Sequence, residues 1–322
     1  MRFHAVSVFL LRRLVELVVL VLLVSFLVFT LEYLAPGSII DALLGTAEKS
    51  PQLVATMRHE YHLDQPFIVQ YALWLKGAVQ LDFGRSVMLN VPVIQAIASR
   101  MQVTLVLGFF GFLIAVVAGL ALGIVAALKK GTGVDRGTVG LTVLGVSAPT
   151  FATGLILLWA FAILLGWFPV IGEGDPNLSD RLWHLTLPAV ALGISGTALM
   201  TKMTRAALIQ ALGQDAIGFA RSRGVGSFRI LFVYGLRNSM VPILTAAGIV
   251  IASTLTGSVL IEETFSLHGI GTLLISSIQN KDIPVVQGAT VLIAVFVIVV
   301  NTLVDVAYLL VDPRTRGKGI TA

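Results

Sequence analysis

Six long runs of apolar residues divide this chain of 322 residues. A helix needs about 20 apolar residues to cross the hydrocarbon of a bilayer. The runs predict membrane spans at residues 9–34, 102–128, 137–166, 186–210, 238–261 and 286–311. A mean hydropathy of +0.94 and a 12% share of charged residues lie outside the range of soluble domains. The sequence therefore predicts an all-α integral membrane protein with six transmembrane helices.

The Lys and Arg residues between the runs fall on alternating sides. Fifteen of the 22 lie in segments 1–13, 129–136, 202–237 and 314–318, in or beside which stand three acids, Asp135, Asp215 and Asp312. The intervals 32–100, 167–185 and 262–285 hold seven Lys and Arg residues against twelve Asp and Glu residues. Because Lys and Arg are enriched on cytoplasmic flanks, we expect both termini in the cytoplasm. The same bias explains the pI near 9.7 without nucleic-acid binding.

The composition gives no support for metal binding or catalysis. The chain has no cysteine, which excludes disulfides, thiolate chemistry and Cys-based metal sites. His59 and His62 are the one histidine pair close in sequence, and two histidines alone do not make a metal site. Neither an HExxH nor a GxSxG motif occurs. We therefore expect no metal site and no catalytic residue.

The interval between the first two spans is too long for a plain connector. Its residues 51–61 and 66–79 have helical apolar spacing, and the loop 81–86 follows them. We expect an extracytoplasmic helical insertion that either meets a soluble partner or packs as a lid. The chain then divides into residues 1–34 with the N-terminus and first span, the insertion 35–101, a five-helix core 102–311 and a cytoplasmic tail 312–322.

The largest cytoplasmic loop, residues 211–237, contains the signals for one short helix. Asp215 suits an N-cap, because its carboxylate can accept hydrogen bonds from first-turn N–H groups. Gly224 suits the C′ position, because glycine adopts the left-handed conformation that ends many helices. The helix between them, ~12 Å long, is too short to be stable alone. It is either a docking helix for another protein or an amphipathic connector.

Glycines and prolines predict how the spans pack and bend. Gly119 and Gly123 form a GxxxG in the second span, and further glycines recur at Gly140, Gly145, Gly193 and Gly196. Small residues let helix backbones approach closely in lipid. Helix breakers inside the spans are Pro149, Gly154, Pro188 and Pro242. They predict kinks, which are either plain bends or parts of a pathway or hinge.

A series of motifs runs through nearly the whole chain in a fixed order. They are Leu11-Arg12-Arg13, Ala35-Pro36-Gly37, Asp82-Phe83-Gly84-Arg85-Ser86, Val146-Ser147-Ala148-Pro149-Thr150-Phe151, Phe219-Ala220-Arg221-Ser222-Arg223-Gly224, Leu236-Arg237-Asn238-Ser239-Met240-Val241-Pro242, Ile261-Glu262-Glu263-Thr264-Phe265, Gly269-Ile270-Gly271 and Asp282-Ile283-Pro284. In this order they resemble the permease subunits of binding-protein-dependent ABC importers, and more narrowly the dipeptide, oligopeptide and nickel branch.

The resemblance implies a division of labour among several chains in the bacterial plasma membrane. It implies two cytoplasmic ATPase subunits that hold ATP and Mg²⁺, a second homologous permease, an external solute-binding protein and a peptide substrate. No Gly-x-x-x-x-Gly-Lys-Ser/Thr motif occurs here, so we expect no ATP hydrolysis and no cofactor on this chain. The residues that the resemblance assigns to ATPase coupling are Asp215, Phe219, Ala220, Arg221, Arg223 and Gly224.

Departures from the family pattern bear on the cargo. They are Gly218 and Phe219 in place of Glu and Ala, His268 in place of a frequent proline, and Ser38-Ile39 in place of Asp-Pro. We expect di- or oligopeptides as cargo, with nickel or glutathione as the alternatives within the family. An ion-coupled secondary transporter is the alternative from another class.

Small polar residues in the spans could line a hydrated pathway. They are Ser147, Thr150, Thr153, Ser195 and Thr197. Asp305 is an acid within the last span, where a charge is costly. We expect it either to pair with Arg12 or Arg13 or to cap a neighbouring helix.

Overall fold

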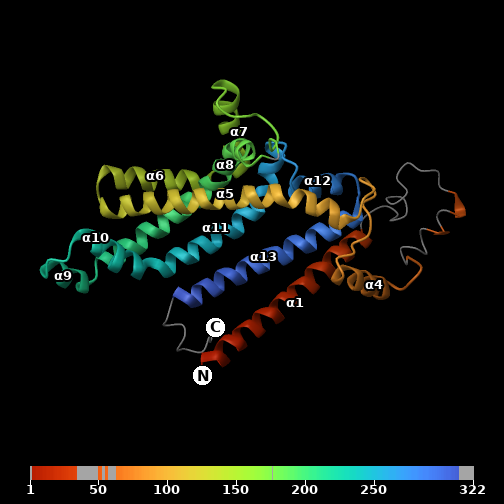
Figure 1. The fold of residues 1–322 in the computed structure, drawn as a ribbon, viewed down its shortest axis with the longest axis horizontal. Coiled ribbons are helices and arrows are strands. Elements are labelled where there is room, and N and C mark those ends of the chain that lie inside the picture. The colour runs from red at the N-terminus through yellow and green to blue at the C-terminus, as the bar shows by residue number, and fades with distance from the viewer. Residues whose placement is uncertain (1, 35–49, 53–54, 57–62, 176, 312–322) are drawn as a thin grey trace. The chain divides into compact units, whose positions relative to one another are not determined.

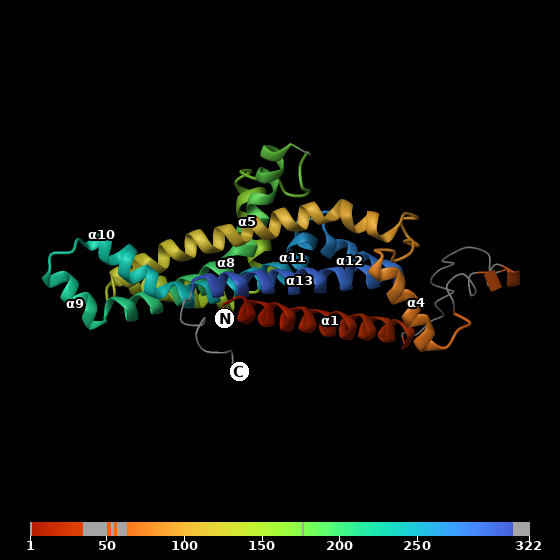
Figure 2. The same cartoon turned by 60° about the horizontal axis from the view of Figure 1, so that its bottom comes forward.

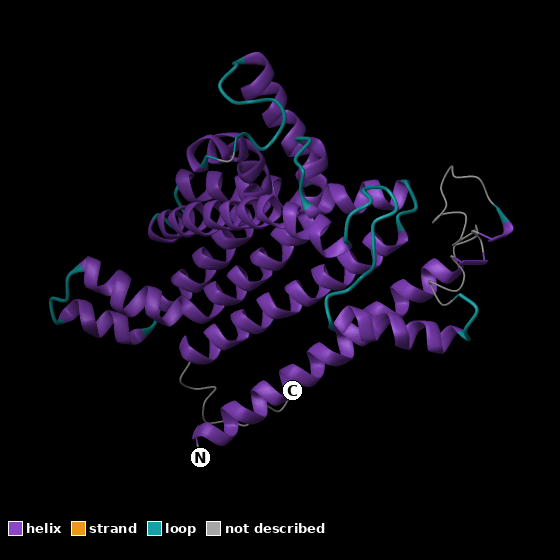
Figure 3. Ribbon diagram, turned by 45° about the vertical axis from the view of Figure 1, so that its right-hand side comes forward, coloured by secondary structure: helices purple, strands orange, loops and turns teal. Residues whose placement is uncertain are grey.

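The computed structural model describes residues 2–34, 50–52, 55–56, 63–175 and 177–311. Within this part every regular element is helical, apart from one isolated bridge between Arg85 and Pro92. Figure 3 shows these helices and the short loops that join them. Five helices are long and apolar enough to cross a membrane, or six if one bent pair counts as a single span. The all-α membrane fold is thus confirmed, whereas the cytoplasmic orientation of the termini stays a prediction.

The described chain forms thirteen helical segments (Figure 1). They are α1 (Arg2–Leu34), α4 (Phe67–Val79), α5 (Val93–Leu128), α6 (Gly133–Ser147), α7 (Thr150–Leu157), the π-helix η1 (Leu158–Leu164), α8 (Leu178–Leu212), α9 (Asp215–Ser222), α10 (Ser227–Arg229), the π-helix η2 (Ile230–Leu236), α11 (Arg237–Thr264), α12 (Ile270–Gln279) and α13 (Ile283–Val311). The chain divides into two compact units, of which unit 1 holds residues 1–5, 103–267 and 299–322, and unit 2 holds residues 6–102 and 268–298.

The spans follow the apolar runs, but some of their ends and one of their interiors differ. The second and fourth begin earlier than expected, at Val93 and Leu178, because polar turns of helix precede the apolar runs. The third is not one helix: α6 ends at Ser147, and α7 with η1 continues at an angle of 107°. Pro149 disfavours helical geometry in Ala148 before it, and Ala148 is extended at φ −78°, ψ 127°.

In unit 1, α8 is the central helix, and α6, α7 and α11 each pack against it. Most of the glycines that were expected at packing faces do lie there. Gly119 and Gly123 of α5 meet Met200 and Thr204 of α8, and Gly145, Gly193 and Gly196 also face neighbouring helices. Gly140 is the exception, because it is exposed with open space around its Cβ position. Its assignment to a packing face within this chain is wrong.

In unit 2, the loop before α5 is fastened to the turn before α13. The Ser86 hydroxyl donates to the Asp282 carboxylate at 2.5 Å, and the backbone N–H groups of Val87 and Met88 donate to it at 3.2 and 3.1 Å. Phe83 packs beside them in a core with Val93 and residues of α12 and α13. Two motifs almost 200 residues apart in the sequence thus meet in one buried contact.

The helices expected in the insertion are described in part. The second is α4, which begins directly after Pro66, so that this proline is the N-cap residue. The first, at 51–61, falls mostly outside the described residues.

On α1, Arg12 and Arg13 bond to Glu16 at 3.0 and 2.8 Å. The side chain of Asp305 lies outside the described part of the chain, so its expected pairing stays a prediction.

Candidate coupling helix

The loop expected to carry the coupling residues lies at one end of unit 1. There α9 connects α8 to α10 and η2, and the turn between α5 and α6 lies at the same end (Figures 1 and 2). Both connections are rich in Lys and Arg. Their shared location agrees with the charge pattern, which predicts one cytoplasmic side for both of them.

The start of α9 differs from the sequence-based expectation by one residue. Gln214, not Asp215, is the N-cap, with φ −73° and ψ 145°, and it makes no side-chain capping bond. The link from α8 consists of Gly213 and Gln214 alone, so the helix begins as soon as the chain has turned. Asp215 lies in the first turn instead, where a carboxylate is favourable to the helix dipole.

The end of α9 confirms that Gly224 occupies the C′ position, as expected. This glycine has φ +77°, and its N–H donates to the Arg221 carbonyl at 2.9 Å. The N–H of Val225 donates to the Ala220 carbonyl at 3.1 Å. These two bonds form a Schellman motif, which satisfies carbonyls that a helix end otherwise leaves open. The helix is therefore closed at its C-terminus by backbone geometry that only glycine adopts without strain.

The two faces of α9 differ sharply. Ile217 and Ala220 are buried, and α9 packs against η2, so these two side chains hold the helix in place. The Phe219 side chain is 71% exposed, and Asp215, Arg221 and Arg223 are exposed as well. An open hollow lined by Leu212, Gly213, Gln214, Asp215, Ile217, Gly218, Phe219, Arg221 and Ser222 runs along the helix. Of the expected coupling residues, Ala220 supports the helix and the others are presented outward.

A pair of exposed aromatic residues beside α9 was not predicted from the sequence. Phe228 of α10 is 75% exposed, and its ring lies 4.4 Å from that of Phe232 in η2, centroid to centroid. Phe219, Phe228 and Phe232 are all exposed, and the last two lie at the start of the helix from Ser227 to Thr264, which is long enough to span the membrane. The available signal was an aromatic residue between Gly226 and Arg229, in a segment whose basic residues predict a cytoplasmic location. Exposed aromatic residues of this kind are typical of protein interfaces.

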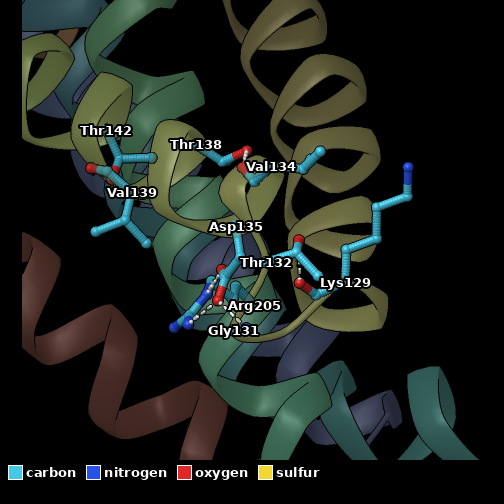
Figure 4. Close-up of polar contacts among 9 residues, drawn as sticks. All are labelled: Lys129, Gly131, Thr132, Val134, Asp135, Thr138, Val139, Thr142 and Arg205. Carbon is cyan, nitrogen blue, oxygen red and sulfur yellow. Dashed lines mark hydrogen bonds and ion pairs between the residues drawn. The ribbon is translucent and has the colours of Figure 1, made fainter.

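An ion pair fixes α8 to α6 close to this end of unit 1 (Figure 4). The Arg205 guanidinium donates to both carboxylate oxygens of Asp135. Its Nε donates to Oδ1 at 2.5 Å, and its Nη2 donates to Oδ2 at 2.8 Å. The backbone N–H of Gly131 donates to Oδ2 at 2.9 Å. Asp135 is buried and Arg205 is partly exposed. A bidentate arginine contact gives geometric specificity, and here it locks the α5–α6 turn to the helix that leads into α9.

The family comparisons identify the class of protein. The family described as "Binding-protein-dependent transport system inner membrane component" matches residues 119–317, and its N-terminal companion matches residues 6–108. The chain belongs to this permease family. It is a multi-pass protein of the bacterial inner membrane and a permease subunit of an ABC importer of the peptide and glutathione branch.

Individual relatives of this permease cover almost its whole length. A "probable peptide ABC transporter permease protein" of Sinorhizobium fredii is 36% identical over 96% of this chain and 99% of its own. A glutathione transport system permease protein of Escherichia coli K12 is 35% identical over 96% and 99%. The solved inward-facing methionine ABC transporter MetNI has a TM-score of 0.50 at 19% identity, covering 68% of this chain and 94% of that chain. That last likeness concerns the fold alone.

The expected pathway residues of the permease lie on three helices, α6, α7 and α8. Ser147, Thr150 and Thr153 flank the bend between α6 and α7, and the Thr153 hydroxyl donates to the Thr150 carbonyl at 2.7 Å. Ser195 and Thr197 lie in the middle of α8, partly buried. Both α6 and α7 pack on α8. Among the hydrogen bonds of the described residues none joins these two groups of hydroxyls, so their pathway role stays a prediction.

Replacing either partner of the Asp135–Arg205 pair should loosen the permease at this end. We expect Arg205→Gln and Asp135→Asn each to lower the thermal stability of the purified transporter, because the first leaves the buried Asp135 and the second the partly buried Arg205 without its partner. The double variant should be no less stable than the worse single variant, since both remove one shared interaction. Thermal unfolding of the three variants in detergent measures this. Additive losses would mean that the two residues act independently.

Proposed function

We propose that this permease passes di- or oligopeptides from an external solute-binding protein across the inner membrane, driven by two ATPase subunits that dock on α9. The structure of α9 is the observation that supports the proposed docking of the ATPases. It is a short helix with a closed C-terminus, a buried support of Ile217 and Ala220, and an outward face with Phe219 and Arg221. Its own packing leaves that face free, and an exposed aromatic beside an arginine suits a protein partner.

The way α9 is connected supports a mechanical role. Two residues link it to α8, and η2 leads directly from α10 into α11. Since α8 and α11 pack against each other along unit 1, a displacement of α9 acts on both helices at once. ATP-driven closure of the ATPases would thereby bias the helix bundle between two arrangements. In this proposal the permease is a non-catalytic subunit, it pairs with a second permease, and both of its termini are cytoplasmic.

The names of the relatives support a peptide cargo, with glutathione as the second candidate. A strain that lacks this permease should lose uptake of labelled di- and tripeptides, and the intact gene should restore it. Loss of glutathione uptake with normal uptake of other peptides would instead favour the glutathione system. Loss of nickel uptake alone would move the cargo to the metal-transporting relatives. Initial uptake rates of the three labelled solutes in one strain pair separate these outcomes.

Dependence on partner chains distinguishes an ABC permease from an ion-coupled transporter. The purified permease, reconstituted alone in liposomes, should accumulate no peptide under a proton or sodium gradient. Adding the ATPase subunits, the second permease, the binding protein and ATP should start accumulation. Accumulation by the lone chain under an ion gradient would overturn the proposed mechanism.

A further inference from the structure

Helix α4 in unit 2 is apolar on nearly all sides. Its thirteen residues include one charged residue, Lys76, and its other polar side chains are those of Gln70 and Tyr71. Gln70 is buried, and its amide donates to the Gln65 carbonyl at 2.8 Å. A helix without a polar face is not a helix surrounded by water. Its outer side must therefore contact protein or lipid.

One side of α4 is covered by α1. Phe26 and Phe29 of α1 lie 5.2–6.0 Å, centroid to centroid, from the rings of Phe67, Tyr71 and Trp74. The Tyr71 hydroxyl lies 2.9 Å from that of Ser25, and it donates to the Leu22 carbonyl at 3.3 Å. These contacts place α4 against the last turns of a membrane-spanning helix, as Figures 1 and 2 show.

The opposite side of α4 is exposed and hydrophobic. The exposed fraction is 64% for Ile68 and 79% for Val79, and Val69 and Leu73 are exposed as well. Residues 68, 72 and 79 lie within ~40° around the helix axis, so that they form one stripe. Lys76 is the single charge on this side, and a lysine can keep its ammonium in water above a buried stem.

The membrane-spanning helix α1, on which α4 packs, is itself exposed and apolar near this stripe. Most of the α1 span is unburied, and Leu22, Leu23, Leu27 and Leu31 are exposed near the turns on which α4 packs. The lipid that covers α1 at that depth therefore meets the side of α4 as well. Tyr71 and Trp74, which join the two helices, are of the residue types enriched where hydrocarbon meets water.

We propose that α4 is a membrane-interface helix, whose exposed face is embedded in the lipid leaflet at the C-terminal end of α1. In this proposal α4 anchors the insertion to the membrane. Through its contact with Phe83 it also holds the loop whose Ser86, Val87 and Met88 donate to Asp282. Trp74 and Ala78 of α4 pack on the same core as Phe83. The occupant of the exposed face is lipid, and the inference does not depend on the cargo.

The absence of cysteine makes this proposal directly testable. Single-cysteine variants Ile68→Cys, Leu73→Cys and Val79→Cys change only exposed side chains, and Gln65→Cys and Gln95→Cys are exposed polar controls. Each variant is spin-labelled in the complete transporter, held in nanodiscs of phosphatidylethanolamine and phosphatidylglycerol. Electron paramagnetic resonance then compares relaxation by oxygen, which concentrates in lipid, with relaxation by a water-soluble nickel chelate.

The three α4 labels should relax mainly with oxygen, and the two controls mainly with the nickel chelate. Relaxation of the α4 labels by the nickel chelate, as in the controls, would show that water covers this face and would overturn the proposal. Protection from both reagents would show a protein neighbour in place of lipid, and it would overturn the proposal equally. None of these readouts uses transport activity, so a wrong cargo assignment leaves the result unaffected.

Discussion

A Gly224→Ala variant should reach the membrane in normal amounts and transport about tenfold more slowly, since 1.4 kcal/mol corresponds to a factor of ten. An added Cβ at φ +77° costs about 1–2 kcal/mol. No atom lies within 4 Å of that Cβ position, so the cost is one of backbone conformation and not of collision. Opening the Schellman motif frays the last turn of α9, which carries Arg221. The helix has two buried residues to hold it, so little else resists the fraying.

Gly224→Asp should have the larger effect and abolish uptake. Aspartate tolerates the left-handed conformation better than alanine does, so the effect comes from its charge. A negative charge at a helix C-terminus is unfavourable to the helix dipole, and here it stands beside the exposed Arg221 on the face proposed to dock on the ATPases. Initial rates of peptide uptake, normalised to the amount of permease in the membrane, measure both variants.

Two controls separate backbone conformation from simple bulk. Gly226→Ala adds the same methyl group two residues away, at φ −63° and also in open space. Gly224→Asn introduces a residue that, unlike alanine, tolerates the left-handed conformation. Both should transport nearly as well as the original permease. Equal losses in Gly224→Ala and Gly226→Ala would contradict the assignment of Gly224, as would full activity of Gly224→Asp.

The existence of the spans could be read from the sequence, but the break in the third could not. Pro149, Pro188 and Pro242 all lie within apolar runs and look alike as sequence signals. Pro188 and Pro242 remain inside α8 and α11. At Pro149 the chain leaves helical geometry and restarts at a large angle. Neighbouring helices decide whether the carbonyl freed by a proline is satisfied in place, and those neighbours are known only from the tertiary structure.

The face on which each glycine lies was in principle available from helix periodicity. Residues 140 and 145 are five positions apart, which is ~140° around an α-helix. They cannot both face α8, and the buried Thr138, Thr142 and Gly145 define the packing face. Composition alone does not distinguish Gly140 from the packing glycines, whereas the angular position of each residue does.

At the candidate site, local signals sufficed for one end of α9 and failed for pairs that are distant in sequence. The left-handed conformation of Gly224 follows from glycine chemistry and needs no tertiary information. The Asp135–Arg205 pair joins residues 70 apart. In the sequence each is one of several charges in a segment predicted to be cytoplasmic. Nothing local distinguishes Arg205 from the other basic residues of that segment.

The largest loss of stability is expected from Gly119→Leu, and even Gly119→Ala should be damaging. A Cβ at residue 119 would lie 2.3 Å from the Met200 Cβ and 3.1 Å from the Thr197 carbonyl oxygen. Neither atom can rotate away, because both are fixed to the backbone of α8. The helices α5 and α8 must therefore move apart, which also loosens the contact of Gly123 with Thr204.

Overpacking of this kind costs about 1–3 kcal/mol, and more for a larger side chain. Gly119→Ala should lower the unfolding temperature of the purified transporter by several degrees, and Gly119→Leu should prevent its assembly. Thermal unfolding in detergent and the yield of assembled complex measure the two variants. Gly137→Ala and Gly140→Ala, at exposed positions of α6 with open space, serve as controls. They should be neutral, since alanine favours a helix more than glycine does.

Compensation at Met200 tests the proposed contact itself. Met200→Gly removes the opposing Cβ, although it leaves a cavity in a fully buried position and is destabilising alone. In that background Gly119→Ala should cost little, because the colliding atom is gone. The difference between the two costs is the coupling energy of the pair. Gly119→Ala could also lower the stability equally in the original protein and in the Met200→Gly background. The close approach of α5 and α8 at this point would then not be what limits stability.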